Sequence, residues 1–416
     1  MKASTFVRKL IFFTIYYMLF CGFVIKNFGV DKSCMFLIDL LYLLLLFRCS
    51  FKIKKAGLGF SMTILKILFF VLFIGAVINF VSPLSFVWGL RNQYFSFVLF
   101  FASASVLCIQ DINKIFKAFF YFQFLNLACA LYQYFVLGLY QDSNNGAFTT
   151  GNGQDIFCGI LMAYYLYKYM CKECKTWHFA FVLISSLVIA AIEEEKFIFI
   201  ETVFIFAYFY FTSKKLGFKK IFIGCALVVV LGVGISLLAQ INGGWNLDVL
   251  TNKEAFMDYQ ENAYALPRIG SSAIIENMFF IHGWQDIFGL GMGTCEDAST
   301  LSFINTDFYE KYGWLEYTWF TFQINFLQTG WLGICLFVAF FISIIVSSMR
   351  GKRKCTDGLK HYYDISIIIT MLCIMTIWYN ATLRSYNSLI PFFAMSLSGI
   401  ITRQLSSQNA ANKNKQ

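Results

Sequence analysis

The feature that most constrains this chain is a series of apolar runs, each close to the length of a membrane-spanning helix. The chain has 416 residues, of which 59% are hydrophobic and 13% charged, and its mean hydropathy is +0.65. Soluble domains are nearer half apolar and a quarter charged. A helix needs about 20 apolar residues to cross the hydrocarbon of a bilayer. We therefore predict an all-α polytopic membrane protein rather than a set of soluble domains.

The runs predict twelve transmembrane helices, which cover about 10–25, 33–47, 60–82, 94–110, 118–139, 156–170, 178–192, 197–212, 221–240, 319–346, 362–379 and 388–402. The residues between the ninth and tenth spans form the only long polar segment, with eleven acidic and three basic residues. The predicted organisation is therefore nine spans, one large extracytoplasmic loop, three spans and a cytoplasmic tail, with bounds at 1–240, 241–318, 319–402 and 403–416.

The basic residues predict the orientation. Of the 33 Lys and Arg, 24 fall on one side of the predicted spans, eight on the other, and Lys66 within a span. The side richer in Lys and Arg is normally cytoplasmic, so both termini should lie inside and the large loop outside. A net charge of +10 would suggest nucleic acid as a partner of a soluble protein. Here its placement follows the membrane, and we expect no nucleic-acid partner.

The cysteines predict neither a metal site nor a disulfide framework. Most of the 13 cysteines lie in apolar runs, and the one Cys-x-x-Cys pair is Cys171 and Cys174 in a short basic inner loop. A zinc site needs about four ligands, and no second pair lies nearby. Cys295 is the only cysteine of the large loop, so we expect reduced thiols and no metal.

Four basic residues lie at outer ends of spans, against the charge bias: Arg91, Lys196, Arg268 and Arg384. An ionisable group near the membrane is costly to hold there and is a candidate for function. Arginine also offers a planar fork that binds phosphate through two hydrogen bonds. We expect the four to surround one outward-facing pocket that holds a diphosphate. The alternative is that each pairs with a neighbouring acid or extends to lipid headgroups.

An unusual charged run, Glu193-Glu194-Glu195-Lys196, separates two apolar runs. Adjacent carboxylates repel one another, so at least one should have a raised pKa or a basic partner. Glu195 and Lys196 adjoin the next span and are the better candidates for a general base or a substrate contact. Glu193 and Glu194 are predicted to form a solvated outer turn.

The glycines at Gly289, Gly291 and Gly293 resemble a phosphate-binding loop only superficially, because a dinucleotide fingerprint needs a βαβ unit. We predict instead a tight return of the loop toward the membrane. Residues 271–284 mix apolar and polar positions and predict a short amphipathic helix over the bundle. Trp284 could stack on a sugar or simply mark the membrane interface.

Three motifs together resemble the O-antigen ligase and polymerase superfamily. Arg268, an amphipathic helix and then Ile-Phe-Gly-Leu-Gly-Met-Gly-Thr at 287–294 is similar to the arginine, helix and glycine turn of its large periplasmic loop. Phe-Leu-Gln-Thr-Gly-Trp-Leu-Gly at 326–333 resembles the continuation into the next span, and 146–152 resembles an earlier outer loop. The resemblance covers about 140–340, and its motifs occur in the expected order.

The resemblance implies a metal-independent glycosyltransferase of the bacterial inner membrane that needs no cofactor. Its substrates would be polyprenyl-diphosphate-linked oligosaccharides, and polyprenyl diphosphate would be released as repeat units are joined. A chain-length regulator protein is a further implied partner. The ligases of this superfamily carry a histidine-asparagine pair ahead of the last motif. No histidine occurs here between 283 and 360, which favours a polymerase.

The resemblance also implies roles for single residues. Arg268 and Arg91 would hold the leaving diphosphate. Glu195 and Lys196 correspond to a serine-arginine pair, and Glu195 would activate the acceptor hydroxyl. The predicted substrate contacts are Lys196, Arg384, Trp284, Gly289, Gly291 and Gly293.

Two other functions remain open from sequence: a ligase that transfers glycan to lipid A-core, and a flippase or other transporter for lipid-linked sugars. Transporters usually show internal repeats and broken helices at mid-membrane, and the sequence shows neither.

Overall fold

The fold is all-α, as predicted. The structure is a computed structural model that describes residues 2–139, 143–193, 196–212, 266–268, 270–297, 304–355 and 357–413, and within these ranges it contains helices and no strand. The predicted ninth span, at 221–240, lies outside the described residues, as does all of 241–265.

Five described helices are long and apolar enough to cross a membrane: α1 (Lys2–Phe28), α3 (Gly59–Ile78), α6 (Ile109–Phe135), α16 (Thr321–Lys354) and α17 (Lys360–Tyr379). Three apolar helices are shorter: α5 (Ser96–Val106), α8 (Thr176–Ile192) and α9 (Lys196–Thr212). These helices are compatible with a multi-pass membrane protein. The number of twelve spans and the orientation of the termini stay predictions.

The segment expected between the third and fourth spans is itself a helix, α4 (Pro83–Tyr94). Its start follows from local chemistry, because the Ser82 side chain accepts a hydrogen bond from the Ser85 N–H and Pro83 supplies a helical φ at the first position. Phe95 keeps helical angles and leads directly into α5. The predicted fourth span, 94–110, therefore corresponds mainly to α5, and α4 precedes it as a separate helix.

The chain forms two compact units. The first comprises Met1–Met18, Lys32–Ile109 and Met257–Gln416, and the second comprises Leu19–Asp31 and Gln110–Phe256. The remaining helices of the first unit are α2 (Phe36–Arg48), α13 (Ser271–Phe279), α14 (Gln285–Phe288), α15 (Asp307–Tyr312), α18 (Leu389–Met395) and α19 (Leu397–Lys413). The short 3-10 helices that matter below are η4 (Gly313–Leu315), η5 (Tyr317–Trp319) and η7 (Ser385–Ser388).

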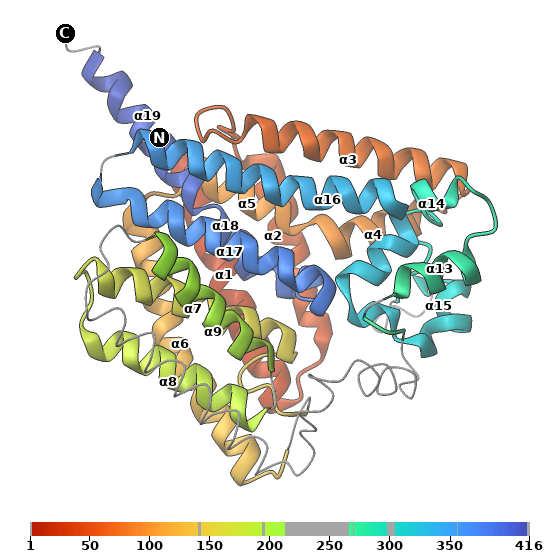
Figure 1. The fold of residues 1–416 in the computed structure, drawn as a ribbon, viewed down its shortest axis with the longest axis horizontal. Helices are drawn as coiled ribbons and strands as arrows, with labels where there is room; N and C mark the ends of the chain where they lie inside the picture. Colours follow the sequence, from red (N-terminus) through yellow and green to blue (C-terminus); the bar gives the residue numbers. More distant parts are fainter. Residues whose placement is uncertain are drawn as a thin grey trace. The chain divides into compact units, whose positions relative to one another are not determined.

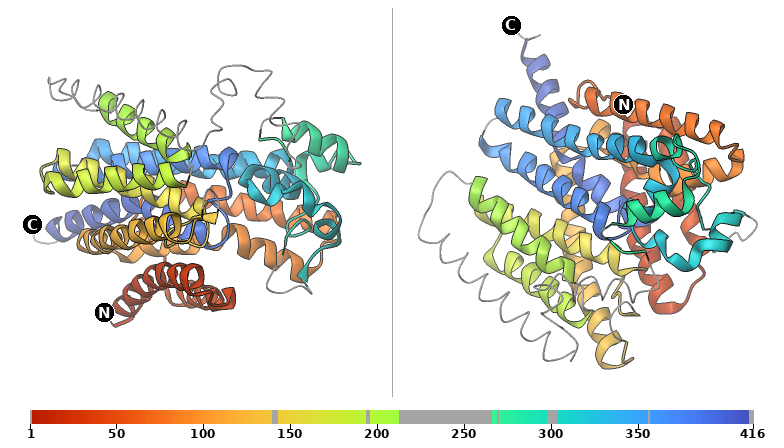
Figure 2. Two further views of the ribbon diagram at one scale, coloured as in Figure 1. Left: turned by 90° about the horizontal axis from the view of Figure 1, so that it is seen from below. Right: turned by 45° about the vertical axis from the view of Figure 1, so that its right-hand side comes forward.

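In the first unit, α16 packs along both α3 and α17, and α5 packs on α18 and α19 (Figure 1). Phenylalanine rings fill the space between these helices. The ring of Phe97 on α5 lies 4.6 Å from that of Phe340 on α16 and 4.7 Å from that of Phe392 on α18. Helices α13, α14 and α15 gather at the end of the unit where α3 ends and α16 begins (Figures 1 and 2).

The second unit contains α6, α7 (Gly151–Met170), α8 and α9, and α7 packs against both α8 and α9. One face of α6 is polar and buried, because Gln123, Asn126 and Gln133 recur at helical spacing. These side chains bind the loop before α7: the Asn126 Oδ1 accepts from the Ala147 N–H at 2.9 Å, and the Gln133 amide donates to the Gly146 carbonyl at 2.7 Å.

Candidate active site

The candidate site lies in the first unit and starts from the glycine turn. Gly289, Gly291 and Gly293 all have positive φ, between 70° and 93°, which L side chains rarely adopt. The turn also needs close approach: a Cβ on Gly293 would lie 2.0 Å from the Ser85 carbonyl oxygen at the start of α4. The predicted tight return of the loop is confirmed.

The turn docks on a break in α16. Gly330 has φ 59° and ψ −167°, which divides the helix after Thr329. At this break the carbonyls of Leu327 and Gln328 accept hydrogen bonds from the backbone N–H groups of Leu290 and Gly291, at 2.7 and 3.1 Å. Two motifs of the resemblance, separated in sequence, thus form one backbone-to-backbone contact.

Glu296 follows the turn and is the centre of a buried polar network. Its side chain is 1% exposed and accepts three hydrogen bonds from three other segments of the chain. Asn92 of α4 donates at 2.7 Å, Gln328 of α16 at 2.9 Å, and Arg384, just before η7, at 2.7 Å. A buried carboxylate that accepts from three such donors holds those segments together.

Arg384 is buried and only partly satisfied. One guanidinium nitrogen binds Glu296, and the other terminal nitrogen donates to the Thr318 carbonyl of η5 at 3.1 Å. Its Nε is buried with no hydrogen-bond partner in the described part of the chain. A buried N–H of a cation without an acceptor is costly, and an oxygen of a bound anion would satisfy it.

Arg91 extends the network to α2. Its Nε and one terminal nitrogen donate to Asp39 at 3.1 and 2.9 Å, and the other donates to Asn92 at 2.6 Å. Arg91 also contacts the hydroxyl of Tyr386, which donates to Asp39 at 3.1 Å. Burial raises the pKa of Tyr386, so the phenol stays protonated. The guanidinium lies 4.7 Å from the ring of Trp88.

Arg268 differs from the other two arginines, because it is exposed and makes no ion pair or hydrogen bond in the described part of the chain. Its guanidinium carbon lies over two aromatic rings, 4.6 Å from that of Tyr379 and 5.2 Å from that of Phe320. Phe320 comes two residues after Thr318, which binds Arg384. Arg268 and Arg384 therefore contact the same short segment, and within the described residues no acid offsets the charge of Arg268.

The segment that contacts both arginines, residues 316–320, begins at Glu316, whose backbone conformation is strained. Glu316 joins η4 to η5 with φ 52°, a left-handed conformation that is uncommon outside glycine. Burial raises the pKa of its carboxyl group, which is half-buried. Such a combination of strain and a perturbed pKa marks a candidate functional group.

The predicted amphipathic helix and Trp284 both lie in the described part of the large loop. The amphipathic helix is confirmed as α13, with Ser271, Ile275 and Phe279 buried on one face, and it ends five residues before Trp284. Trp284 immediately precedes α14, and its ring stacks near that of His282.

The charged run before α9 belongs to the second unit. Lys196 begins α9, but its side chain and all of Glu195 lie outside the described residues. The prediction that Glu193 is solvated is wrong. It is 2% exposed and accepts a hydrogen bond from Gln154 at 3.0 Å, because it ends α8 inside the polar interior of its unit.

Sequence reasoning missed five members of the network: Asp39, Asn92, Glu296, Gln328 and Tyr386. Only Asp39 gave a usable signal, as an acid inside an apolar run. Glu296 is one of eleven acids in the 241–318 loop, and nothing in its neighbourhood along the chain distinguishes it.

No protein-family model matches this chain, and no curated protein matches its sequence. The likeness to the O-antigen ligase and polymerase superfamily therefore rests on the motif residues themselves.

Proposed function

We propose that this protein polymerises polyprenyl-diphosphate-linked oligosaccharide repeat units at the outer face of a bacterial inner membrane. The observation that carries the proposal is the contact between the glycine turn and the break at Gly330. The hydrogen-bonded residues of the two motifs that suggested the function lie 37 residues apart along the chain, yet they pack together. Through Gln328 and Glu296, this contact is also linked to Arg384. A chance likeness of scattered motifs gives no reason for that convergence.

In the proposed reaction, a hydroxyl of the acceptor repeat unit attacks the anomeric carbon of the donor chain. The new glycosidic C–O bond forms as the C–O bond to the diphosphate breaks, and the hydroxyl proton passes to a base. Polyprenyl diphosphate leaves with the bonding electron pair. Its developing negative charge is what positively charged groups held in advance would stabilise.

Arg268 is the best-placed residue for that charge. It is exposed and has no carboxylate partner among the described residues, and its stacking on Tyr379 and Phe320 limits its motion. Arg384 would add its unsatisfied Nε from the other side of η5. A diphosphate offers several oxygens, so it could accept from both residues at once.

Arg91 takes a different role in this proposal from the one the sequence suggested. Asp39 already balances its charge, and Tyr386 and Asn92 occupy the rest of its donors. Arg91 therefore acts as a positioning residue that fixes Asn92, which in turn binds Glu296. Glu296 then holds Arg384 in place.

Glu316 is our candidate within the first unit for the base that accepts the hydroxyl proton. A carboxylate is a suitable base when its pKa is shifted upward toward the working pH, and burial shifts that of Glu316 in this direction. The role predicted for Glu195 stays a prediction, since that residue is outside the described part.

The proposal is tested in cells that lack the gene and carry a variant copy. Arg268→Ala should leave single repeat units on the surface and abolish longer chains, while the protein still inserts. Arg268→Lys should also lose most long chains, because an ammonium cannot replace the two-pronged guanidinium.

Lys311→Ala is the matched control, since Lys311 is an exposed basic residue of the same loop. It should give wild-type chain lengths. Long chains in both Arg268 variants would remove Arg268 from the site. Complete loss of surface units in cells without the gene would instead indicate a ligase or a flippase.

A further inference from the structure

A second polar feature lies at the other end of α3, away from the glycine turn. Here nine residues line a cavity of about 480 Å³: Phe51, Lys52, Ile53, Lys54, Lys55, Gly59, Met62, Thr63 and Lys66. Four of the nine are lysines and none is acidic. The glycine turn contacts the last turn of α3, because Gly75 approaches the Phe288 carbonyl. The cavity is lined by α3 residues from Gly59 to Lys66 and the turn contacts Gly75, so the two features are separated by about 14–24 Å along the helix.

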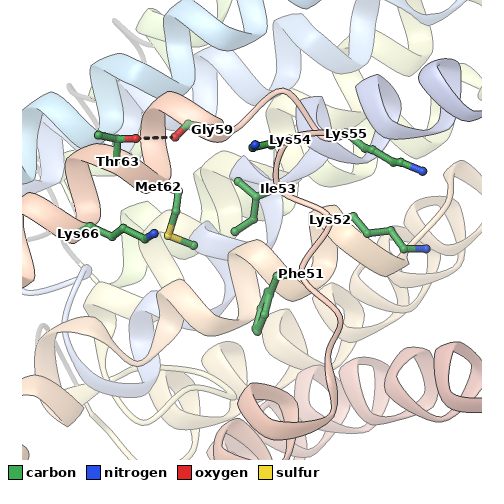
Figure 3. Close-up of a pocket in the computed structure, with 9 residues that line it drawn as sticks. All are labelled: Phe51, Lys52, Ile53, Lys54, Lys55, Gly59, Met62, Thr63 and Lys66. Carbon is green, nitrogen blue, oxygen red and sulfur yellow. Dashed lines mark hydrogen bonds between the residues drawn. The ribbon is translucent and has the colours of Figure 1, made fainter.

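The lysines of the cavity have no charge partner. None of the four side chains makes a hydrogen bond or an ion pair in the described part of the chain. Figure 3 shows the amino group of Lys66 directed inward beside Met62 and that of Lys54 on the side of the loop nearest α3, while those of Lys52 and Lys55 extend away. Like charges that line one cavity without an acid repel one another, and an anion would relieve the repulsion.

The start of α3 adds to the positive potential. No side chain caps the helix at Leu58, so the N–H groups of its first turn point toward the same region without a side-chain acceptor. The partial positive charge of a helix N-terminus favours phosphate oxygens. Combined with Lys54 and Lys66, this end of α3 provides both charge and hydrogen-bond donors for one phosphate group.

An apolar stripe continues from the cavity along α3. Lys66 is exposed on the same face of the helix as a row of exposed apolar side chains. This row consists of Ile67, Phe70, Phe73 and Val77, each 48% exposed or more. Their spacing of three and four residues places them in line above Lys66. A phosphate with acyl chains attached would contact the lysines with its headgroup and the stripe with its chains.

We propose that this lysine cavity binds the phosphate of an anionic phospholipid in the cytoplasmic leaflet, with an acyl chain along the exposed face of α3. Basic pockets on the cytoplasmic side of membrane helices are suited to such headgroups. The cytoplasmic assignment follows from the distribution of Lys and Arg. This inference does not depend on the proposed function.

The test measures lipid binding to the purified full-length protein by native mass spectrometry. Short-chain phosphatidylglycerol should bind more tightly than the matching phosphatidylcholine. The double variant Lys54→Gln with Lys66→Gln should lower phosphatidylglycerol affinity by on the order of 20-fold, since each lysine near an anionic group contributes a factor of several. Both residues line an open cavity, so the variant should keep the wild-type melting temperature.

The matched control is Lys52→Gln with Lys55→Gln, which removes the same charge from the same loop. The amino groups of Lys52 and Lys55 extend away from the cavity. Their removal should therefore lower the affinity for phosphatidylglycerol at most about threefold at physiological salt. An equal loss in both double variants would show only general attraction to anionic lipid and would overturn the site.

Two further probes separate a lipid from a free phosphate. Glycerol 3-phosphate carries the phosphate without acyl chains and should bind far more weakly than phosphatidylglycerol. Millimolar inorganic phosphate should fail to displace the lipid. Displacement of the lipid by phosphate would refute the lipid assignment. Equal binding of phosphatidylglycerol and phosphatidylcholine would refute it too.

Discussion

Replacing Glu296 by glutamine tests whether this carboxylate holds the candidate site together. Glutamine keeps the size and shape of the side chain and removes only the charge and one acceptor. Glu296 receives hydrogen bonds from Arg384, Asn92 and Gln328, and it is 1% exposed. In the variant, the new amide NH₂ would face at least one of these donors, and Arg384 would keep a buried charge without its acid.

The loss of stability expected for Glu296→Gln follows from the distance between Arg384 and Glu296. At the 2.7 Å separation of Arg384 and Glu296, Coulomb attraction at an effective dielectric constant of about 20 is roughly 6 kcal/mol, and desolvation of both groups opposes it. Removing one partner of such a buried pair costs about 3–5 kcal/mol. Two lost hydrogen bonds to a charged group, at about 1.5–3 kcal/mol each, give a similar figure. We expect Glu296→Gln to destabilise this region by about 3–5 kcal/mol.

The accessibility of Cys295 can report this loss of stability, because Cys295 directly precedes Glu296 and is fully buried. Burial also raises the pKa of its thiol, so the native side chain reacts slowly. In a variant with Cys295 as the only cysteine, the rate of maleimide labelling reports local opening of the network. The expected loss of stability corresponds to labelling that is about 100- to 4,000-fold faster.

Two companion variants make the test decisive. Asp297→Asn changes the neighbouring acid, whose side chain lies outside the network, and should leave the labelling rate within about twofold. Adding Arg384→Gln to Glu296→Gln removes the uncompensated charge, so the double variant should label more slowly than Glu296→Gln alone. Wild-type labelling in Glu296→Gln would refute the view that this carboxylate anchors the site.

Three more outcomes are expected. Gly330→Ala should cost about 2–4 kcal/mol in thermal unfolding, because its Cβ would lie 2.5 Å from the Ile287 carbonyl carbon at a positive φ, whereas Gly283→Ala, with open space around it, should be near neutral. Polymerisation in membrane vesicles should rise as pH increases through the raised pKa of Glu316, and Glu316→Gln should remove that activity; an unchanged profile would exclude Glu316 as the base. A cysteine placed at position 258 in a cysteine-free chain should label from outside only, and labelling from inside would reverse the predicted topology.

The helices and the glycine turn were predictable because their causes are local. Apolar composition fixed most helix positions, and only a backbone at positive φ explains three glycines at alternate positions in a loop. The short helix α13 was likewise predictable from the spacing of its own apolar residues. The start of α4 could also have been predicted, from the Ser82 cap and Pro83, but hydropathy alone does not indicate it.

The partners of the arginines were not predictable, because they depend on tertiary contacts. Arg91 pairs with Asp39, 52 residues earlier, and Arg384 pairs with Glu296, 88 residues earlier. Among the described three, Arg268 alone has no acid partner in the described part of the chain, and the shared pocket stays a prediction. For the other two, the alternative of an acid partner applies. Glu193 was misjudged for the same reason, since its burial depends on the packing of α6 and α7 around it.

The break at Gly330 also dictates an order of assembly. The glycine turn has its neighbours on both sides of it in sequence: Gly291 packs on Val81, made long before it, while its hydrogen-bond acceptor Gln328 is made after it. During synthesis the turn therefore cannot reach its final position until α16 has been made and inserted beside α3. Until then its backbone donors must remain in water. A ribosome stalled between residues 300 and 320 should accordingly carry a loop that an external protease cuts readily, and completion of α16 should protect it.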